Sequence, residues 1–402
     1  MDKSEKTVNC IDLFCGAGGF SVGVEMSSDA FSVVGGIDME ESAVETFEEN
    51  HKDAVGVVDD ISSLKPDDFE SELPVDSVDV IIGGPPCKGF SSIRPNRSSD
   101  EIDYRNYLYQ DYLRFVNYFE PDVFVLENVP AIINHTISDE PILDTILSEI
   151  EDLGYTFEWN LLNSAFYGVP QARTRFILIA VKDSSQEIMF PEPTHSFQDK
   201  EIEKKRLIHQ DNTITPELGE LKPVVTSLEA ISDLPSVEAG EKNNTYAKPP
   251  QNDFQRLMRT TLNGELMTND MLTQHRATNH SDEMVEILEE AGFKRSDIPE
   301  DLRPPTGYEA TYSRQYPNQP STTLTTEYTT AGATRCVHPD DSVARALTVR
   351  EGMRIQSFPD WYIFCGTKTS ITEQVGNAVP PLLGEHIGCS IYNMLFEDTI
   401  EV

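Results

Sequence analysis

The sequence predicts an α/β fold in which a mostly parallel, doubly wound sheet is joined to a smaller, irregular second domain. Two observations support this prediction. Short apolar runs alternate with helical patterns through the first 182 residues, and this regularity is lost between about Ser184 and Cys336. Alternating strands and helices build parallel sheets, because a crossover must return the chain before the next parallel strand can begin.

The elements of the first half follow one another without internal repeats. Three segments space their apolar residues as helices do, and they read ESAVETFEENH, RNYLYQDYLRFVNYF and PILDTILSEIEDLG. Between and around them lie short apolar runs that are typical of buried strands. These runs are Val8–Phe14, Ser32–Ile37, Ala54–Val58, Val78–Ile82, Asp122–Leu126 and Arg175–Val181.

The second half is divided by a polar insert. Its segment KNNTYAKPPQND is typical of a loop, and SDEMVEILEEAGF predicts a helix. Strong patterning returns from about Ala344, in RALTVREGMRIQSF and AVPPLLGEHIGCSIYNMLF. We therefore expect a first domain over residues 1–183, an inserted domain over 184–336, and a last part over 337–402 that packs back onto the first domain.

The composition limits the cellular compartments in which the protein is expected. The N-terminus carries charges where a signal peptide needs an apolar core, and no apolar run is long enough to span a bilayer. The cysteines form no CxxC pair, so they indicate neither a metal site nor a disulfide framework. We expect a reducing, cytoplasmic location. The cysteines are Cys10, Cys15, Cys87, Cys336, Cys365 and Cys389.

The formal net charge of -38 is unusual. Taken alone it argues against a nucleic-acid partner, because such proteins normally present a basic face. Adaptation to a very salty cytoplasm is another explanation, since the Debye length is only ~3 Å at about 1 M salt, and we favour this halophile interpretation. Residues 291–354 carry 8 basic and 8 acidic residues. They either face an anionic partner or escape the acidic bias by chance.

Three features at successive strand ends point to a nucleoside-containing cofactor. DLFCGAGGFSVG, from Asp12 to Gly23, is a glycine-rich turn before a helix, but it lacks the dinucleotide spacing G-x-G-x-x-G. Asp38 ends the second strand, where a carboxylate can bind ribose hydroxyls. Asp60 and Ile61 follow the third strand. Each feature alone also fits a tight turn or a helix N-cap.

The segment GGPPCKGFSS presents Cys87 at the end of the fourth strand. Prolines fix φ and glycines leave room, so this turn would hold the thiol at a defined place on the carboxyl edge of the sheet. Ligands bind at that edge in open α/β sheets. The alternative is a buried structural thiol, which describes most free cysteines.

Two further segments carry charged residues to the same edge. VFVLENVP ends a strand with Glu127 and Asn128, where a carboxyl group could donate a proton or simply cap a turn. QARTRFILIAV places Arg173 and Arg175 two residues apart at a strand start, so we expect both to point the same way. They would bind an anion or a polar ring, or form surface ion pairs.

Together these segments resemble the motifs of the DNA (cytosine-5) methyltransferases. The resemblance rests on DLFCGAGGF, GGPPCKGFS, LENV, QARTRF, ALTVREGMRIQSFP and QVGNAVP, in this order and spacing. It covers residues 8–182 and 344–390. It implies an S-adenosylmethionine-dependent, Rossmann-like methyltransferase domain, with the insert as a target-recognition domain and double-stranded DNA in the cleft between them.

The resemblance also implies residue roles. Cys87 is similar to the family's nucleophile and Glu127 to the acid that engages cytosine N3, with Arg173 and Arg175 supporting the flipped base. The implied DNA-contacting residues are Lys88, Ser91, Arg105, Thr323 and Leu324. The implied S-adenosylmethionine-binding residues are Phe14, Ala17, Gly18, Gly19, Asp38, Met39, Asp60, Ile61, Pro86, Leu108, Asn377 and Ala378.

Two departures and three alternatives accompany the resemblance. Lys88 stands where glutamine is usual, and Cys15 where alanine or serine is usual, but neither removes a catalytic atom. An RNA (tRNA) cytosine-5 methyltransferase, a non-catalytic DNA-binding relative and a nicotinamide-dependent oxidoreductase are the alternatives. We expect an active monomer without a membrane partner, with a separate cognate restriction endonuclease as a further possibility.

Overall fold

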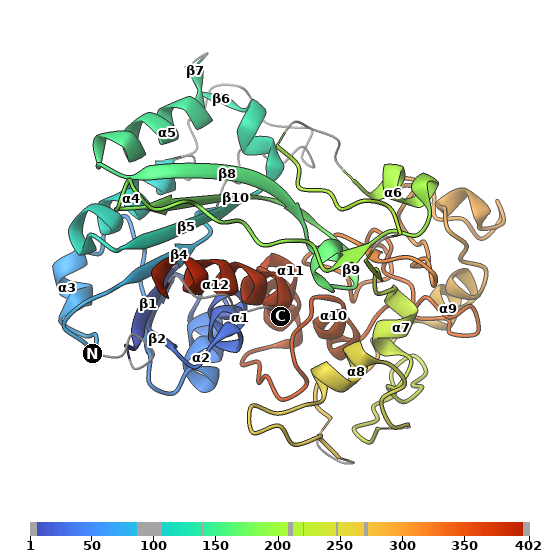
Figure 1. Ribbon diagram of the computed structural model, residues 1–402. Helices are drawn as coiled ribbons and strands as arrows, with labels where there is room; N and C mark the ends of the chain where they lie inside the picture. The colour runs from blue at the N-terminus through green and yellow to red at the C-terminus, as the bar shows by residue number, and fades with distance from the viewer. Residues whose placement is uncertain are drawn as a thin grey trace.

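The computed structural model describes residues 6–86, 107–137, 140–207, 212–219, 221–246, 248–268 and 272–396. Its centre is a seven-stranded sheet in the order β3-β2-β1-β4-β5-β10-β8 (Figure 1). The strands from β3 to β5 are parallel, and β10 is antiparallel to both neighbours. The predicted α/β fold with a mostly parallel sheet is confirmed. The strands are β1 (Val8–Leu13), β2 (Phe31–Asp38), β3 (Val55–Val58), β4 (Val80–Gly83), β5 (Val123–Asn128), β8 (Thr156–Asn163) and β10 (Thr174–Val181).

The edge strand β8 is absent from the six predicted strands. Phe157, Trp159 and Leu161 alternate with polar residues along it, as in a strand with one covered face. Between β8 and β10 lie only the 3-10 helix η4 (Ser164–Tyr167) and the short strand β9 (Gln171–Ala172). This connection is too short for the crossover that a parallel neighbour needs, so β10 runs antiparallel.

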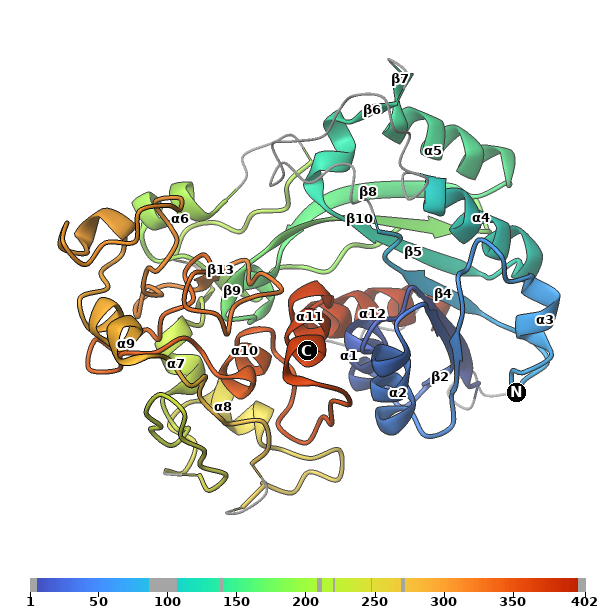
Figure 2. The ribbon, with the colours of Figure 1, turned by 180° about the vertical axis from the view of Figure 1, so that it is seen from behind.

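Each face of the sheet has its own hydrophobic core, because successive side chains of a strand point to opposite faces. In β5, Val123 and Val125 belong to one core, and Phe124 and Leu126 belong to the other. Burial on both faces explains the continuous apolar runs of the strands. Figure 2 shows the helices on both sides of the sheet. The first core is covered by α1 (Gly19–Ser27), α2 (Glu41–Asn50) and α12 (Pro381–Phe396), and the second by α3 (Pro66–Glu70), α4 (Leu108–Phe119) and α5 (Ile142–Asp152).

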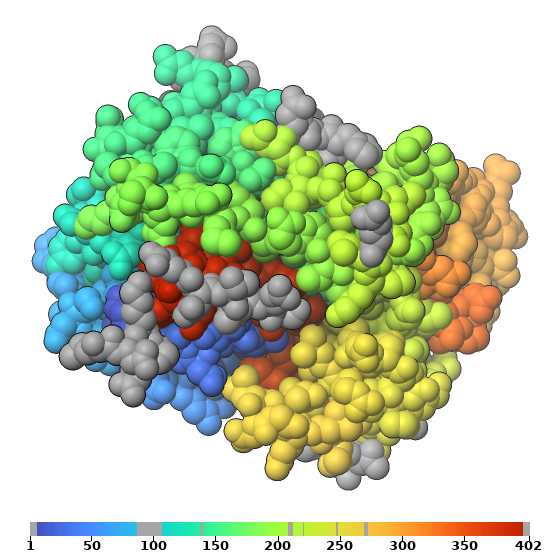
Figure 3. Space-filling model, viewed as in Figure 1, coloured from blue at the N-terminus to red at the C-terminus, as the bar shows by residue number. Residues whose placement is uncertain are grey.

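The C-terminal helix α12 packs against α1 so closely that the backbones of the two helices are in contact at Gly23. A Cβ on Gly23 would lie 2.3 Å from the carbonyl oxygen of Pro381, so a side chain at this position would clash with the backbone of α12. In Figure 3 the main red area, from the C-terminal residues, lies between a green surface above it and the blue surface of the N-terminal residues below it. Helix α12 is thus part of the packed interior of the molecule.

The insert forms short elements joined by loops. The predicted helix at SDEMVEILEEAGF is confirmed as α9. No helix among the described residues is long and apolar enough to cross a membrane. The remaining elements, in chain order, are η3 (Pro130–Asn134), β6 (Thr136–Ile137), β7 (Glu140–Pro141), β11 (His195–Ser196), α6 (Lys200–Arg206), β12 (Lys222–Pro223), α7 (Ser227–Ile231), α8 (Asp253–Met258), α9 (Asp282–Glu289), η5 (Arg295–Asp297), β13 (Ser321–Thr322), α10 (Val349–Ile355) and α11 (Lys368–Asn377).

A buried ion network joins the insert to α10 and the loop that follows it. Arg354 donates from Nε and Nη2 to Asp360 at 2.5 and 2.6 Å, and from Nη1 to Asp233 at 3.1 Å. Arg350 pairs with Asp360, and Arg259 pairs with Asp233. Burial lowers the pKa of Arg354, but the two carboxylates outweigh burial and raise it. Removing any member would leave an uncompensated buried charge, so the network links the two parts firmly.

Candidate active site

The carboxyl ends of β4 and β5 bring Glu127 beside the glycine–proline turn. The two strands are parallel neighbours, with Gly83 opposite Leu126. A Cβ on Gly84 would lie only 2.9 Å from Glu127 Oε2, so the glycine makes room for the carboxyl group. Asn128 donates from Nδ2 to the carbonyl oxygen of Pro85 at 3.1 Å. The turn that leads to Cys87 is therefore held against the end of β5.

Several predicted residues of this turn lie beyond what the structure describes. Pro86, which directly precedes Cys87, is half-buried and is the last described residue before the gap. The predicted residues outside the described ones are Cys87, Lys88, Ser91 and Arg105.

Glu127 forms a largely buried ion pair with Arg175. Arg175 Nε lies 2.7 Å from Glu127 Oε1, and the two side chains are 11% and 13% exposed. Arg175 also donates from Nη1 to the carbonyl oxygen of Thr174 at 2.8 Å. Burial lowers the pKa of Arg175, and the neighbouring Glu127 raises it. The pair presents a carboxyl and a guanidinium group together beside the turn.

Arg173 has different partners from Arg175. It donates from Nη1 to the carbonyl oxygen of Gly376 at 3.1 Å and from Nη2 to that of Asn377 at 3.4 Å. These carbonyls end α11, where the helix dipole is negative and favours a cation. Burial and the nearby charge of Arg175 lower the pKa of Arg173, while Glu127 raises it. Its Nε is buried without a hydrogen-bond partner in the described part of the chain.

Asp38 ties the glycine-rich loop to the start of α2. Its Oδ2 accepts from the Gly16 N–H at 2.9 Å, and its Oδ1 accepts from the Glu40 N–H at 3.0 Å. Phe14, at the start of the loop, is half-buried and has a φ of 64°, which is uncommon for a residue with a side chain. The loop is therefore held in one conformation by β2.

An uncovered apolar surface lies beside this carboxylate. Met39 follows β2 and is 62% exposed, and Val58 ends β3 and is 49% exposed. Ile61 is buried, and Arg114 of α4 donates to its carbonyl oxygen at 2.6 Å. Asp60 Oδ1 accepts from the backbone and hydroxyl of the next turn. Apolar surface for a base and a carboxylate for ribose hydroxyls fit the adenosine part of S-adenosylmethionine.

The back of the glycine-rich loop rests on a phenol and an imidazole. Tyr362 donates to the carbonyl oxygen of Ala17 at 2.5 Å. A Cβ on Gly18, which has a φ of 74°, would lie 2.8 Å from both Tyr362 Oη and His51 Nε2. Gly19 is buried as well. Sequence motifs do not predict Tyr362 or His51 as supports of the loop, because neither residue is near the loop along the chain.

The remaining predicted residues are spread around this region. Leu108 is buried in the second core, whereas Asn377 is exposed and Ala378 is half-buried. Thr323 is exposed, but Leu324 is buried and donates its N–H to Gln171 Oε1 at 3.0 Å. Gln171 stands in the quoted motif QARTRF, yet its role in joining the insert to β9 was not predicted. Only the folded chain brings these segments together.

The sheet order, the glycine-rich loop without a phosphate fingerprint and the strand-end carboxylate define an S-adenosylmethionine-dependent methyltransferase. Comparison with known families specifies it further. A family model described as C-5 cytosine-specific DNA methylase matches residues 8–393. The chain belongs to this family, whose members transfer the methyl group of S-adenosylmethionine to C5 of cytosine in DNA.

Individual relatives agree with this assignment. The chain is 33% identical over 386 residues to the Type II methyltransferase M1.HphI of Haemophilus parahaemolyticus, covering 96% of this chain and 86% of the relative. It is 34% identical over 402 residues to the Type II methyltransferase M.DdeI of Desulfomicrobium norvegicum, covering 94% and 87%. A solved structure described as a DNA modification methyltransferase encoded within an E. coli prophage has a TM-score of 0.69, with 26% identity over 97% of this chain and 99% of that one.

The buried carboxyl of Asp12, under the glycine-rich loop, predicts a pH effect on stability. Burial raises its pKa to about 7, although Ser21 Oγ donates to it at 2.6 Å. A carboxyl whose pKa rises on folding stabilises the fold while protonated, and that contribution is lost as pH rises from about 4 through about 7. We therefore expect the stability of Asp12→Asn, measured relative to the parent, to be higher at pH 8 than at pH 5.

Thermal unfolding of both proteins at the two pH values measures this effect. Asp53→Asn, at an exposed carboxylate, is the matched control and should show no such trend. An Asp12→Asn shift that is the same at pH 5 and pH 8 would contradict the expectation.

Proposed function

We propose that the protein methylates cytosine through a covalent intermediate in which Cys87 is the nucleophile. The observation that carries this proposal is the position of Glu127 against the Gly84–Pro85 turn, two residues before Cys87. A proton donor for the ring and a nucleophile for its C6 atom must approach one base together. The parallel pairing of β4 and β5 supports such an arrangement.

The chemistry explains why a thiolate is needed. Cytosine C5 is a poor nucleophile, but addition of a thiolate to C6 converts the ring to an enamine whose C5 accepts a methyl group. S-adenosylmethionine supplies that group as an electrophile. Negative charge develops on N3 during addition, and a protonated Glu127 would neutralise it by donating its proton. Removal of the C5 proton then expels the thiolate and restores the ring.

The target base must leave the duplex to reach this site, at a cost of roughly a few kcal/mol. We propose that residues 1–183 and 337–402 form the catalytic domain and that residues 184–336 recognise the target, with double-stranded DNA between them. Lys88, Ser91, Arg105, Thr323 and Leu324 are proposed to contact that DNA. The exposed position of Thr323 supports its part in this set.

We propose that the cofactor lies along the ends of β1, β2 and β3. Asp38 would bind the ribose, because each of its oxygens keeps a lone pair after its backbone contact. Met39 would contact the adenine with its exposed side chain. The remaining proposed contacts are Phe14, Ala17, Gly18, Gly19, Asp60, Ile61, Pro86, Leu108, Asn377 and Ala378.

The relatives suggest a biological setting. Two of them are Type II methyltransferases, so we propose that this protein protects DNA from a separate cognate endonuclease and acts as a cytoplasmic monomer. The net charge of -38 supports a halophilic origin. Surface self-repulsion of this size is tolerated where salt screens it.

The covalent step can be trapped. Fluorine at C5 cannot leave as a cation, so a duplex with 5-fluorocytosine at the target should stay bonded to the enzyme after methyl transfer. The adduct should survive denaturing electrophoresis, require S-adenosylmethionine and be absent from Cys87→Ala. Glu127→Gln should form it at least ~10²-fold more slowly, because N3 loses its proton donor.

A duplex with ordinary cytosine is the control and should give no lasting adduct. Trapping on fluorinated RNA alone would support the RNA alternative. Absence of an adduct on either nucleic acid, with cofactor bound and the target present, would show that Cys87 is not the nucleophile.

The two arginines should differ in kinetics. Arg175→Lys loses the Nε contact to Glu127 and should lower kcat by about 10²-fold, as loss of a preorganised donor does. Arg173→Lys loses contacts to the carbonyl oxygens of Gly376 and Asn377 at the end of α11, and Asn377 is one of the proposed cofactor contacts. It should raise KM for S-adenosylmethionine about tenfold with a smaller effect on kcat. Steady-state kinetics and calorimetric cofactor titration separate these effects; equal losses of kcat with unchanged cofactor affinity would contradict the assignment.

The halophile proposal predicts an unusual salt response. An ordinary DNA-binding protein loses affinity steeply as salt rises. Here activity should increase from dilute buffer towards molar KCl before it falls, because screening relieves repulsion between the acidic protein and DNA. Circular dichroism over the same series separates binding from folding. Maximal activity of a fully folded protein in dilute buffer would refute the halophilic origin.

A further inference from the structure

We propose that Arg206 and Arg335, held on the ring of Tyr316, bind the phosphate backbone of the DNA substrate and do not read its bases. The inference rests on the proposed engagement of duplex DNA by the insert. It adds a contact that none of the sequence motifs predicts.

Two guanidinium groups share one aromatic ring. The Cζ atoms of Arg206 and Arg335 lie 4.9 and 4.4 Å from the ring centroid of Tyr316. Phe293 stacks on the same ring at 4.7 Å with an interplanar angle of 13°. Arg206 comes from the end of α6 and Arg335 from the loop before α10, so the fold assembles the cluster from distant parts of the insert.

Hydrogen bonds orient both guanidinium groups. Arg206 donates from Nε and Nη2 to Gln319 Oε1 at 3.1 and 2.9 Å. Arg335 donates from Nη1 to the carbonyl oxygen of Phe293 at 3.0 Å and from Nη2 to Tyr316 Oη at 3.2 Å. Both side chains are half-buried yet reach the surface. The groups are therefore preorganised, which reduces the entropy lost when an anion binds.

The cluster lacks a counter-ion among the described residues. No salt bridge joins either arginine to a carboxylate there, although the chain has 69 acidic and 31 basic residues. Burial lowers the pKa of Arg206 to about 10, and the charge of Arg335 adds to this lowering. Stacking attracts one cation to a ring, but a second cation at the same ring is repelled by the first. An external anion would relieve that repulsion.

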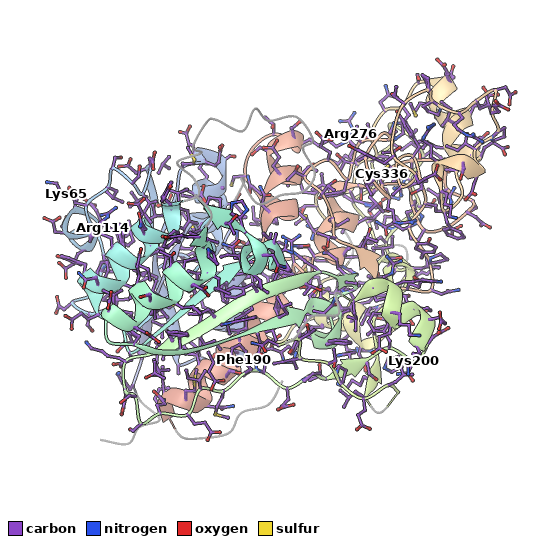
Figure 4. The ribbon with its side chains drawn as sticks, turned by 90° about the horizontal axis from the view of Figure 1, so that it is seen from above. Lys65, Arg114, Phe190, Lys200, Arg276 and Cys336 are labelled. Carbon is purple, nitrogen blue, oxygen red and sulfur yellow. The ribbon has the colours of Figure 1, made fainter. Side chains whose placement is uncertain are left out.

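The cluster lies near the candidate active site along the β9–β13 pair. Gln319 is two residues before Ser321, which pairs with Gln171, and Arg173 is two residues beyond Gln171. Figure 4 shows Lys200 of α6 and Cys336, the neighbour of Arg335, at the same end of the molecule, opposite Lys65 and Arg114.

The geometry favours phosphate over base edges. Both arginines are tied back to Tyr316, Gln319 or a backbone carbonyl, whereas reading a base requires reach into a major groove about 8.5 Å deep. Phosphates lie on the outside of the duplex and accept paired hydrogen bonds from a guanidinium fork. Residues 291–354, which include Arg335 and Tyr316, are also free of the acidic bias of the chain.

Charge removal and charge conservation test the proposal. Arg206→Gln and Arg335→Gln should each raise KM for DNA several-fold without changing kcat. Each should also make the slope of log K against log salt more positive by about 0.9 than the parent slope, whatever the sign of the parent slope. Arg206→Lys and Arg335→Lys keep the charge and should keep the parent slope. Lys204→Gln, on the same helix but paired with Glu201, is the matched control and should behave as the parent.

A methylphosphonate scan locates the contact. The duplex carries the target sequence, found by bisulfite sequencing of host DNA, with one neutral methylphosphonate at each backbone position in turn. The parent should lose affinity at one or two backbone positions near the target cytosine, and the double variant Arg206→Gln/Arg335→Gln should be insensitive at those positions.

The possible outcomes are distinct. Unchanged salt slope and KM in folded Gln variants, or Lys variants that lose as much as Gln variants, would show that the cluster only packs against Tyr316 and would overturn the proposal. An altered sequence preference would show base reading and would overturn it as well. Failure of the parent itself to bind or methylate duplex DNA would instead refute the proposed function.

Discussion

Parallel pairing of the central strands is the constraint on which the rest of the structure depends. Because β1, β2, β4 and β5 run the same way, their carboxyl ends meet at one edge of the sheet. The glycine-rich loop, Asp38, the Gly84–Pro85 turn and Glu127 all follow from that arrangement. A change in the register of β4 against β5 would separate Glu127 from the turn that leads to Cys87.

Buried charges that are paired with opposite charge link distant segments of the structure. Sheet pairing joins the irregular insert to the rest of the molecule over a short stretch, between β9 and β13. The network around Arg354 and Asp360, whose members are almost completely buried, adds a second link. At the candidate active site the same principle recurs with different partners, a carboxylate for Arg175 and helix-end carbonyls for Arg173. Buried cations need nearby negative charge, so each binds two segments together.

The sequence predicted those strands best that are buried on both faces. The strands of the parallel core were predictable because burial on two faces makes them continuously apolar. β8 is covered on one face and lies at the edge, so its signal is the weaker alternation of Phe157, Trp159 and Leu161. The motifs likewise located Glu127 and Asp38, because strand ends are visible in the chain. They could not show that Arg173 and Arg175 have different partners, since those partners come from α11 and β5.

The sequence by itself determined the order of the buried strands, the strand-end residues and the family, because local patterning and motif spacing are properties of the chain alone. Tertiary structure alone decided which distant groups meet. Tyr362 supports Ala17 across 345 positions of sequence, and Gln319 meets Arg206 across 113. The reason is physical: a hydrogen bond or a stacked ring requires atoms a few ångströms apart, and only the packed core brings segments so distant in the chain to that separation.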